Sequence, residues 1–251
     1  MRCGIDLGSR SVKVVVMAAD ASELTATAVY ETAKFYREYG HRTDSGLAVD
    51  FAALHLPAVA RLTATGYGRN TINIVGATVI PELKAHMLGA IAQTGLTDFT
   101  LLDLGGQDSK VIKVRNSRMV DFQTNDKCAA STGRYLENMA AVLGIGLEEL
   151  ADYSAQPVEL SATCAIFGES ELIGRIVEGF TVAELAAGVN YTIYKRIKPM
   201  LSALKSDKIV FTGGVALGGA IKQFITREMG VEVIVPAHPQ LNGAIGCAVY
   251  K

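Results

Sequence analysis

Two short stretches, one near the start of each half of the chain, carry the same residue types at the same spacing. Residues 5–14 read IDLGSRSVKV and residues 102–111 read LDLGGQDSKV, so Asp, Leu, Gly, Lys and the final Val coincide without a gap. Apolar residues adjoin both stretches, and apolar runs broken by a glycine turn are typical of a β-hairpin. Two unrelated hairpins are the simpler alternative, but five identities in ten positions favour an internal duplication.

The residue types in these hairpins suit a nucleotide phosphate and its Mg²⁺ ion. Gly8, Gly105 and Gly106 let backbone N–H groups approach an anion with no Cβ in the way. Asp6 and Asp103, at the expected strand ends, are placed to hold the water ligands of Mg²⁺. Polar side chains after the first turn are also expected around the phosphates: Ser9, Arg10, Ser11 and Lys13. Two such hairpins would hold one nucleoside triphosphate between them.

Three residues are candidates for the catalytic step. Gln107, just past the second glycine turn, would orient the attacking water, as a Gln does in some GTPases. Glu82, at the start of a helix expected from about Pro81 to Gln93, is the alternative for that role. Asp103 would act as a carboxylate base if the chain were a kinase. For the lysines of both hairpins, Lys13 and Lys110, a solvated strand residue is an equally simple interpretation.

A third glycine turn and a closing segment follow late in the chain. An expected strand at 208–212 leads into Gly213, Gly214 and Val215, where bare backbone would accept the flat ring of an adenosine. The small residues at 242–248 predict a helix that packs tightly on a sheet. The sequence contains no G-x-x-x-x-G-K-[ST], no G-x-G-x-x-G after a strand and no H-E-x-x-H or paired C-x-x-C. The histidines show no ligand spacing and receive no role: His41, His55, His86 and His238.

Two cysteines precede expected helices. The apolar pattern after Cys128 predicts a helix that starts at or just after it, and a second helix would begin beside Cys164. A helix N-terminus lowers a thiol pKa and favours a bound anion, such as a thiolate-ligated iron–sulfur cluster. A 4Fe-4S cluster normally takes four cysteines, and a two-fold dimer would supply two plus two. The alternative for any cysteine is a buried thiol, which we expect for Cys3 and Cys247.

The local sequences favour the cluster. Residues 125–137 read NDKCAASTGRYLE and residues 161–171 read SATCAIFGESE. Both resemble the cluster motifs of the 2-hydroxyacyl-CoA dehydratase activators, a family that includes the ATPase subunits of benzoyl-CoA reductase and the reductases of double-cubane cluster proteins. Four further stretches match this family in order: TGYGR at 65–69, the hairpin at 103–112, FTGGVA at 211–216 and NGAIG at 242–246.

The resemblance covers most of the chain, and only residues 18–60 lack an obvious counterpart. Three positions depart from the family pattern and leave its subfamily open. Ser131 stands where members often have Gly, Gly168 where they often have Ala, and Ala85 where several activators have Cys.

This resemblance implies an α/β protein with the actin-like ATPase fold: two ribonuclease-H-like halves, residues 1–93 and 94–251, with the nucleotide in the cleft between them. It implies a homodimer with one 4Fe-4S cluster, held by Cys128 and Cys164 of each subunit, and MgATP in each subunit. Reduced ferredoxin or flavodoxin would be the electron donor. ATP hydrolysis would drive one electron to a partner iron–sulfur enzyme, such as a 2-hydroxyacyl-CoA dehydratase or a double-cubane cluster protein.

The composition of the chain limits which classes of function remain possible. The 251 residues include 24 Lys and Arg against 25 Asp and Glu, which argues against a general binder of nucleic acid or anionic membranes. The chain has no apolar run near the roughly 18 residues of a membrane span and no leading signal region, so we expect a cytoplasmic protein. A small-molecule kinase of the same superfamily and a non-catalytic nucleotide-dependent interaction module are the alternatives. Both leave the cysteine motifs unexplained.

Overall fold

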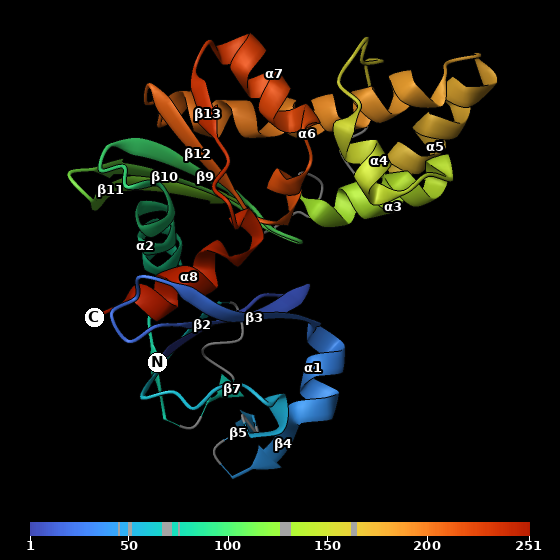
Figure 1. Ribbon diagram of the computed structural model, residues 1–251. Helices are drawn as coiled ribbons and strands as arrows, with labels where there is room; N and C mark the ends of the chain where they lie inside the picture. The colour runs from blue at the N-terminus through green and yellow to red at the C-terminus, as the bar shows by residue number, and fades with distance from the viewer. Residues whose placement is uncertain (45, 50–51, 67–71, 75, 126–131, 162–164) are drawn as a thin grey trace. The chain divides into compact units, whose positions relative to one another are not determined.

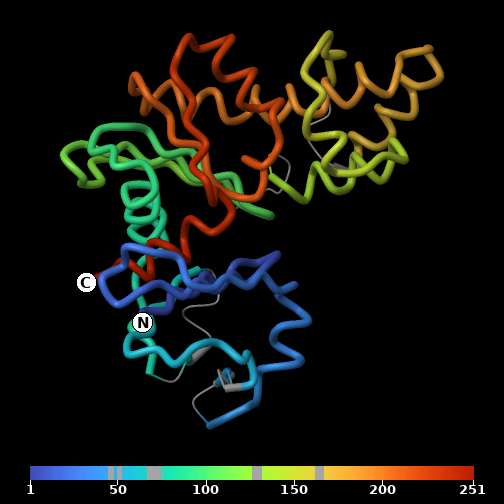
Figure 2. Tube along the Cα trace, viewed as in Figure 1, coloured from blue at the N-terminus to red at the C-terminus, as the bar shows by residue number. Residues whose placement is uncertain are grey.

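The computed structural model describes residues 1–251 except 45, 50–51, 67–71, 75, 126–131 and 162–164. The chain forms two compact units (Figures 1 and 2). Unit 1 contains Met1–Leu96 together with Leu241–Lys251, and unit 2 contains Thr97–Gln240. The division at residues 93 and 94 that the sequence suggested put the last segment in the second half, whereas its contacts put it in unit 1.

Each unit is built around a five-stranded sheet with the same strand order. In unit 1 the order is β3 (Leu24–Glu31), β2 (Ser11–Met17), β1 (Arg2–Leu7), β6 (Arg61–Gly66) and β8 (Ala77–Val79). In unit 2 it is β11 (Arg118–Asn125), β10 (Ser109–Arg115), β9 (Phe99–Leu104), β12 (Lys208–Thr212) and β13 (Glu232–Ile234). In both sheets the first three strands of this order pair antiparallel and the others pair parallel. The duplication suggested by ten residues therefore extends over both sheets.

The composition of the strands decides their place in each sheet. All six residues of the apolar strand β9 are buried, and so are five of the six in β1. These strands lie in the middle of their sheets, where neighbouring strands satisfy the backbone on both edges. The edge strands β3 and β11 carry alternating or mostly exposed side chains instead. The central strands therefore carry the Asp-Leu-Gly segments into well-packed positions.

Helices and short elements complete the two units. Unit 1 adds α1 (Thr32–Tyr39), η1 (Ala52–Leu54), α2 (Glu82–Thr94), α8 (Asn242–Val249) and a small sheet of β4 (Gly40–Thr43), β5 (Gly46–Val49) and β7 (Ile72–Asn73). Unit 2 adds α3 (Gly133–Leu143), α4 (Leu147–Asp152), α5 (Ala165–Val177), α6 (Val182–Ala203), η4 (Gly214–Leu217) and α7 (Ala220–Met229), and the turn η5 (Pro239–Leu241) leads into α8. Among the described helices, none combines the length and apolar character that crossing a bilayer requires.

Small residues allow α8 to approach its neighbours closely. All residues from Asn242 to Ala248 are buried, and α8 lies beside α2 and β1 within unit 1 (Figure 1). A Cβ on Gly246 would overlap the carbonyl oxygen of Ala85, and a Cβ on Gly4 would overlap that of Ala244. The tightly packed closing helix predicted from the sequence is confirmed, and this contact explains why the end of the chain belongs to unit 1.

Candidate functional site

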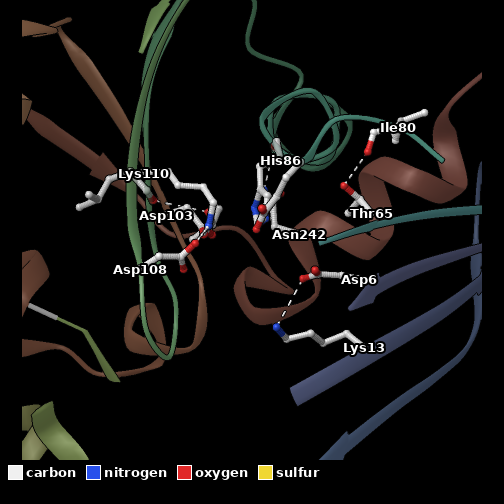
Figure 3. Close-up of polar contacts among 12 residues, drawn as sticks. Asp6, Lys13, Thr65, Ile80, His86, Asp103, Asp108, Lys110 and Asn242 are labelled. Carbon is white, nitrogen blue, oxygen red and sulfur yellow. Dashed lines mark hydrogen bonds and ion pairs between the residues drawn. The ribbon is translucent and has the colours of Figure 1, made fainter. Parts of the chain in front are cut away.

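The hairpin of unit 1 brings an aspartate and a lysine together. Asp6 and Lys13 are paired across β1 and β2, and Lys13 Nζ lies 3.4 Å from Asp6 Oδ2 (Figure 3). The lysine side chain is only 16% exposed, because it lies over the turn. A Cβ on Gly8 would lie 2.8 Å from Nζ and 2.7 Å from the carbonyl oxygen of Ser11. Glycine therefore keeps the space under this ammonium group open.

The hairpin of unit 2 repeats this arrangement. Asp103 and Lys110 occupy the same paired positions of β9 and β10, with Lys110 Nζ 3.7 Å from Asp103 Oδ2. The ammonium group also pairs with Asp108, and its side chain is 6% exposed. A Cβ on Gly105 would lie 2.6 Å from an oxygen of Asp108. Both lysines thus lie against carboxylates at the turns rather than in solvent.

The two aspartates differ in the hydrogen bonding of Oδ1, the carboxylate oxygen that is not the one paired with the lysine. Thr212 Oγ1 lies 2.8 Å from Asp103 Oδ1 and donates a buried hydrogen bond to it. The corresponding residue of unit 1, Thr65, instead donates to the carbonyl oxygen of Ile80 at 2.9 Å (Figure 3). Among the residues that the structure describes, nothing donates a hydrogen bond to Asp6 Oδ1, although Asp6 is 3% exposed. A buried acceptor without a donor is costly, so this oxygen is available for a ligand.

Helix α2 brings two more titratable groups to Asp6. Ligand atoms of Asp6, Glu82 and His86 all lie within 4.8 Å of one another, with His86 Nε2 4.0 Å from Glu82 Oε1. Asn242 anchors this part of the helix by donating to the His86 carbonyl oxygen at 2.8 Å. The sequence reasoning missed His86. The available signal was its spacing of four residues from Glu82, which places both on one face of a helix.

The Gly-Gly turn of unit 2 lies next to the strand that carries Asp103. Gly213 has φ +90°, and a Cβ there would overlap the carbonyl oxygen of Leu104. Gly214 has an open side, since the nearest atom to its Cβ position is Gln240 Nε2 at 3.9 Å. Val215 is buried beneath the turn. That an adenosine ring lies against this backbone stays a prediction.

The turn of the second hairpin also contacts helix α3. The backbone N–H groups of Gly133 and Arg134 donate to the carbonyl oxygens of Gly105 and Gly106 at 2.9 and 3.0 Å. Helix α3 begins at Gly133, five residues after Cys128 and so later than the sequence suggested. Two hydrogen bonds therefore connect the turn expected to bind phosphate with the start of α3.

The remaining residues that the sequence analysis singled out fall in four groups. Ser9, Arg10 and Ser11 lie at the turn between β1 and β2 and are partly exposed, and Gln107 is exposed at the other turn. Cys128, Ser131 and Cys164 lie outside the described residues. Cys3 and Cys247 are buried free thiols, as expected. A Cβ on Gly168 would make only ordinary contacts, so an alanine would fit there.

Comparison with known proteins identifies the family of this chain. The model of the BadF/BadG/BcrA/BcrD ATPase family matches residues 3–250. The chain belongs to this family. It is 34% identical to the (R)-2-hydroxyglutaryl-CoA dehydratase activating ATPase of Acidaminococcus fermentans over 98% of this chain and 95% of that protein. It is 33% identical to the activator of lactoyl-CoA dehydratase of Anaerotignum propionicum, over 98% and 95% of the two chains.

Solved structures support the same assignment. The activator of the 2-hydroxyisocaproyl-CoA dehydratase from Clostridium difficile, determined with bound ADPNP, superposes with a TM-score of 0.84 and 31% identity, covering 99% of this chain and 93% of that one. The family member described here therefore has the α/β actin-like ATPase fold, and membership of an ATPase family supports ATP binding and hydrolysis.

Proposed function

We propose that this family member is an ATP-dependent activator that delivers low-potential electrons, one at a time, from a 4Fe-4S cluster to a partner iron–sulfur enzyme. The partner would be a 2-hydroxyacyl-CoA dehydratase or a double-cubane cluster protein, and reduced ferredoxin or flavodoxin would be the donor. The observation that carries the proposal is the pair of matching Asp–Lys hairpins in a chain that aligns almost end to end with dehydratase activators.

The ATP-binding role rests on residues from both units. The fit to Mg²⁺ rests on the open, buried oxygen of Asp6, since a carboxylate oxygen without a donor suits a water ligand of the ion. Asp103 is held by Thr212 and Lys110 and would fix a second water. Mg²⁺ supplies charge neutralisation for the phosphates. The other proposed contacts come from the two turns and the Gly-Gly turn: Gly8, Ser9, Arg10, Ser11, Lys13, Gly105, Gly106, Gly213, Gly214 and Val215.

Orientation of the attacking water has two candidate residues. Glu82 is partly buried, with Oε1 4.0 Å from His86 Nε2. Gln107 is exposed at the turn of the other hairpin. The more enclosed position of Glu82 favours it over Gln107 as the group that orients this water, because an enclosed group needs less reorganisation in the transition state.

The electron-transfer role rests on Cys128 and Cys164. We infer that these thiolates hold the cluster, two from each subunit of a homodimer, and the cluster supplies the one-electron redox centre. The described part of helix α5 starts at Ala165. The sequence predicts a helix N-terminus beside Cys164, and such a terminus would favour a thiolate. Helix α3, which follows Cys128, is hydrogen-bonded to the turn at Gly105 and Gly106. A change at this turn on ATP hydrolysis would therefore reach the Cys128 segment.

Metal analysis tests the cluster. Protein purified without oxygen should contain about two irons and two acid-labile sulfides per subunit, the ratio of one four-iron cluster per dimer. The Cys128→Ser and Cys164→Ser variants should lose them, and Cys3→Ala, which changes a buried thiol of unit 1, should retain them. A wild-type protein that hydrolyses ATP without bound iron would refute the proposal and favour the kinase alternative.

A backbone variant tests the coupling. Proline at position 133 removes the N–H that donates to Gly105, while the first position of a helix tolerates proline. The proline ring would also displace the carbonyl oxygen of Gly105, so Gly133→Pro should keep iron but deliver fewer electrons to an acceptor protein per ATP hydrolysed. Gly133→Ala keeps the donor and should behave as wild type. Equal electron delivery per ATP in all three proteins would contradict this route.

A further inference from the structure

Three potential metal ligands of unit 1 come together from two elements. Asp6 lies one residue before the end of the central strand β1, and Glu82 and His86 lie four residues apart on α2. The ligand atoms of the three residues lie within 4.8 Å of one another. Ligands of one ion at about 2.1 Å lie roughly 3–4 Å apart, so a small side-chain movement would complete the set. Asp6 and His86 are buried, and Glu82 is partly buried. The groups therefore form an interior cluster rather than an acidic surface.

A glycine keeps space open beside this cluster. A Cβ on Gly243 would lie 3.0 Å from Asp6 Oδ2 and 3.1 Å from His86 Nε2. Asp6 Oδ1, the other oxygen of the same carboxylate, is buried and receives no hydrogen bond from the described residues, so the carboxylate has room for a donor or a cation. Asp103, the counterpart of Asp6 in unit 2, receives a hydrogen bond from Thr212 at this oxygen. In unit 2 the hydroxyl group of Thr212 therefore occupies the position beside the aspartate where unit 1 could accept a ligand.

The surrounding charges are compatible with a divalent ion. The cluster contains two carboxylates, those of Asp6 and Glu82, and the ammonium group of Lys13 lies 3.4 Å from Asp6 Oδ2. With a neutral imidazole ligand, the side chains of Asp6, Glu82, His86 and Lys13 together carry one net negative charge.

We propose that Asp6, Glu82 and His86 bind a divalent first-row transition-metal ion directly, with His86 Nε2 as the nitrogen ligand and without nucleotide. An imidazole ligand favours first-row ions such as Ni²⁺ or Zn²⁺ over Mg²⁺, which prefers oxygen and keeps its waters, and Mn²⁺ serves as a spectroscopic probe of the site. The site differs in this from the water-mediated Mg²⁺ proposed above. It does not depend on the cysteines, the dimer or electron transfer.

Manganese titration tests the site on the full chain. The room-temperature EPR signal of free aqueous Mn²⁺ reports binding directly in nucleotide-free protein, and we expect one bound ion per chain. His86→Gln and Glu82→Gln should weaken binding by at least about tenfold, since even loss of an outer-sphere partner costs 10–100-fold. Gly243→Ala keeps every ligand but fills the space, so it should weaken binding as well. His238→Gln changes an exposed histidine of unit 2 and should bind as wild type.

Competition and a second control separate this site from the nucleotide's metal. Mg²⁺ at a tenfold excess should leave Mn²⁺ bound, whereas equimolar Zn²⁺ should displace it. Asp103→Asn, which changes a carboxylate of unit 2, should bind Mn²⁺ as wild type even though we expect it to lose ATP hydrolysis. Absence of Mn²⁺ binding in the wild type, unchanged affinity in His86→Gln, or equal displacement by Mg²⁺ would each overturn the proposal.

Discussion

Replacing Thr212 with valine removes one hydroxyl group and keeps the branched shape of the side chain. In the wild type this hydroxyl donates a 2.8 Å hydrogen bond to Asp103 Oδ1, and both residues are buried. After the replacement, that oxygen loses its neutral donor, and Lys110, at 3.7 Å from Oδ2, is the ammonium group left beside the carboxylate. The carboxylate should then leave the position in which we expect it to hold a water of Mg²⁺.

The expected magnitude follows from the charge of the acceptor. A hydrogen bond to a charged group contributes about 1.5–3 kcal/mol to stability, against about 1 kcal/mol for a neutral pair. Thr65→Val is the matched control, because Thr65 occupies the corresponding position of unit 1 and donates to a neutral carbonyl oxygen. Thr212→Val should therefore lower the free energy of unfolding of unit 2 by about 1 kcal/mol more than Thr65→Val lowers that of unit 1. Hydrogen exchange measured peptide by peptide gives each unit its own value.

ATP hydrolysis measured against Mg²⁺ concentration is the functional assay. If about 1.4 kcal/mol of the lost hydrogen-bond energy held the aspartate in place, Thr212→Val should need about tenfold more Mg²⁺ for half-maximal activity. Thr65→Val should keep the wild-type Mg²⁺ dependence. The reasoning would be refuted if both variants shifted equally, or if Thr212→Val lost stability but kept the wild-type response to Mg²⁺.

Two further predictions concern stability. Gly246→Ala should destabilise unit 1 by at least about 1–3 kcal/mol, because the new methyl group would overlap the carbonyl oxygen of Ala85, whereas Gly174→Ala in α5 has open space and should be neutral or stabilising in the same denaturation assay. Burial raises the pKa of Cys3 and of Tyr36 to about 12, so both groups stay neutral in the folded protein above the pH at which they ionise in the unfolded chain. Stability should therefore be complete below about pH 9 and fall as pH rises toward 12, with a shallower fall in Cys3→Ala; a denaturation midpoint that does not change from pH 8 to 11 would contradict this.

The hairpins could be predicted from the sequence because their signals are local. Apolar runs broken by a glycine turn predicted the two hairpins, and the pairing of β1 with β2 and of β9 with β10 confirms them. The small residues at 242–248 likewise predicted a tightly packed helix. Each of these features depends on neighbours within about ten positions along the chain. The pairing of each aspartate with the lysine of its hairpin was not predicted.

The features that were missed depend on long-range contacts. His86 meets Asp6 across 80 residues, and nothing in its own helix identifies that partner. Thr212 lies 109 residues from Asp103, and its role depends on parallel pairing of β12 with β9. The place of α8 in unit 1 depends on close contact with β1 and α2 rather than on its own sequence.

The two copies of the hairpin differ in the hydrogen bond made by one neighbouring threonine. Both copies keep an aspartate, a lysine and a glycine turn, and both follow them with a threonine on the adjacent parallel strand. In unit 2 the threonine points its hydroxyl hydrogen at the carboxylate and fixes it. In unit 1 it bonds a backbone carbonyl, and the carboxylate keeps an open oxygen. A fixed carboxylate suits a preorganised position, whereas an open one suits exchange of a ligand, so we expect the two copies of the motif to differ in how they hold a ligand.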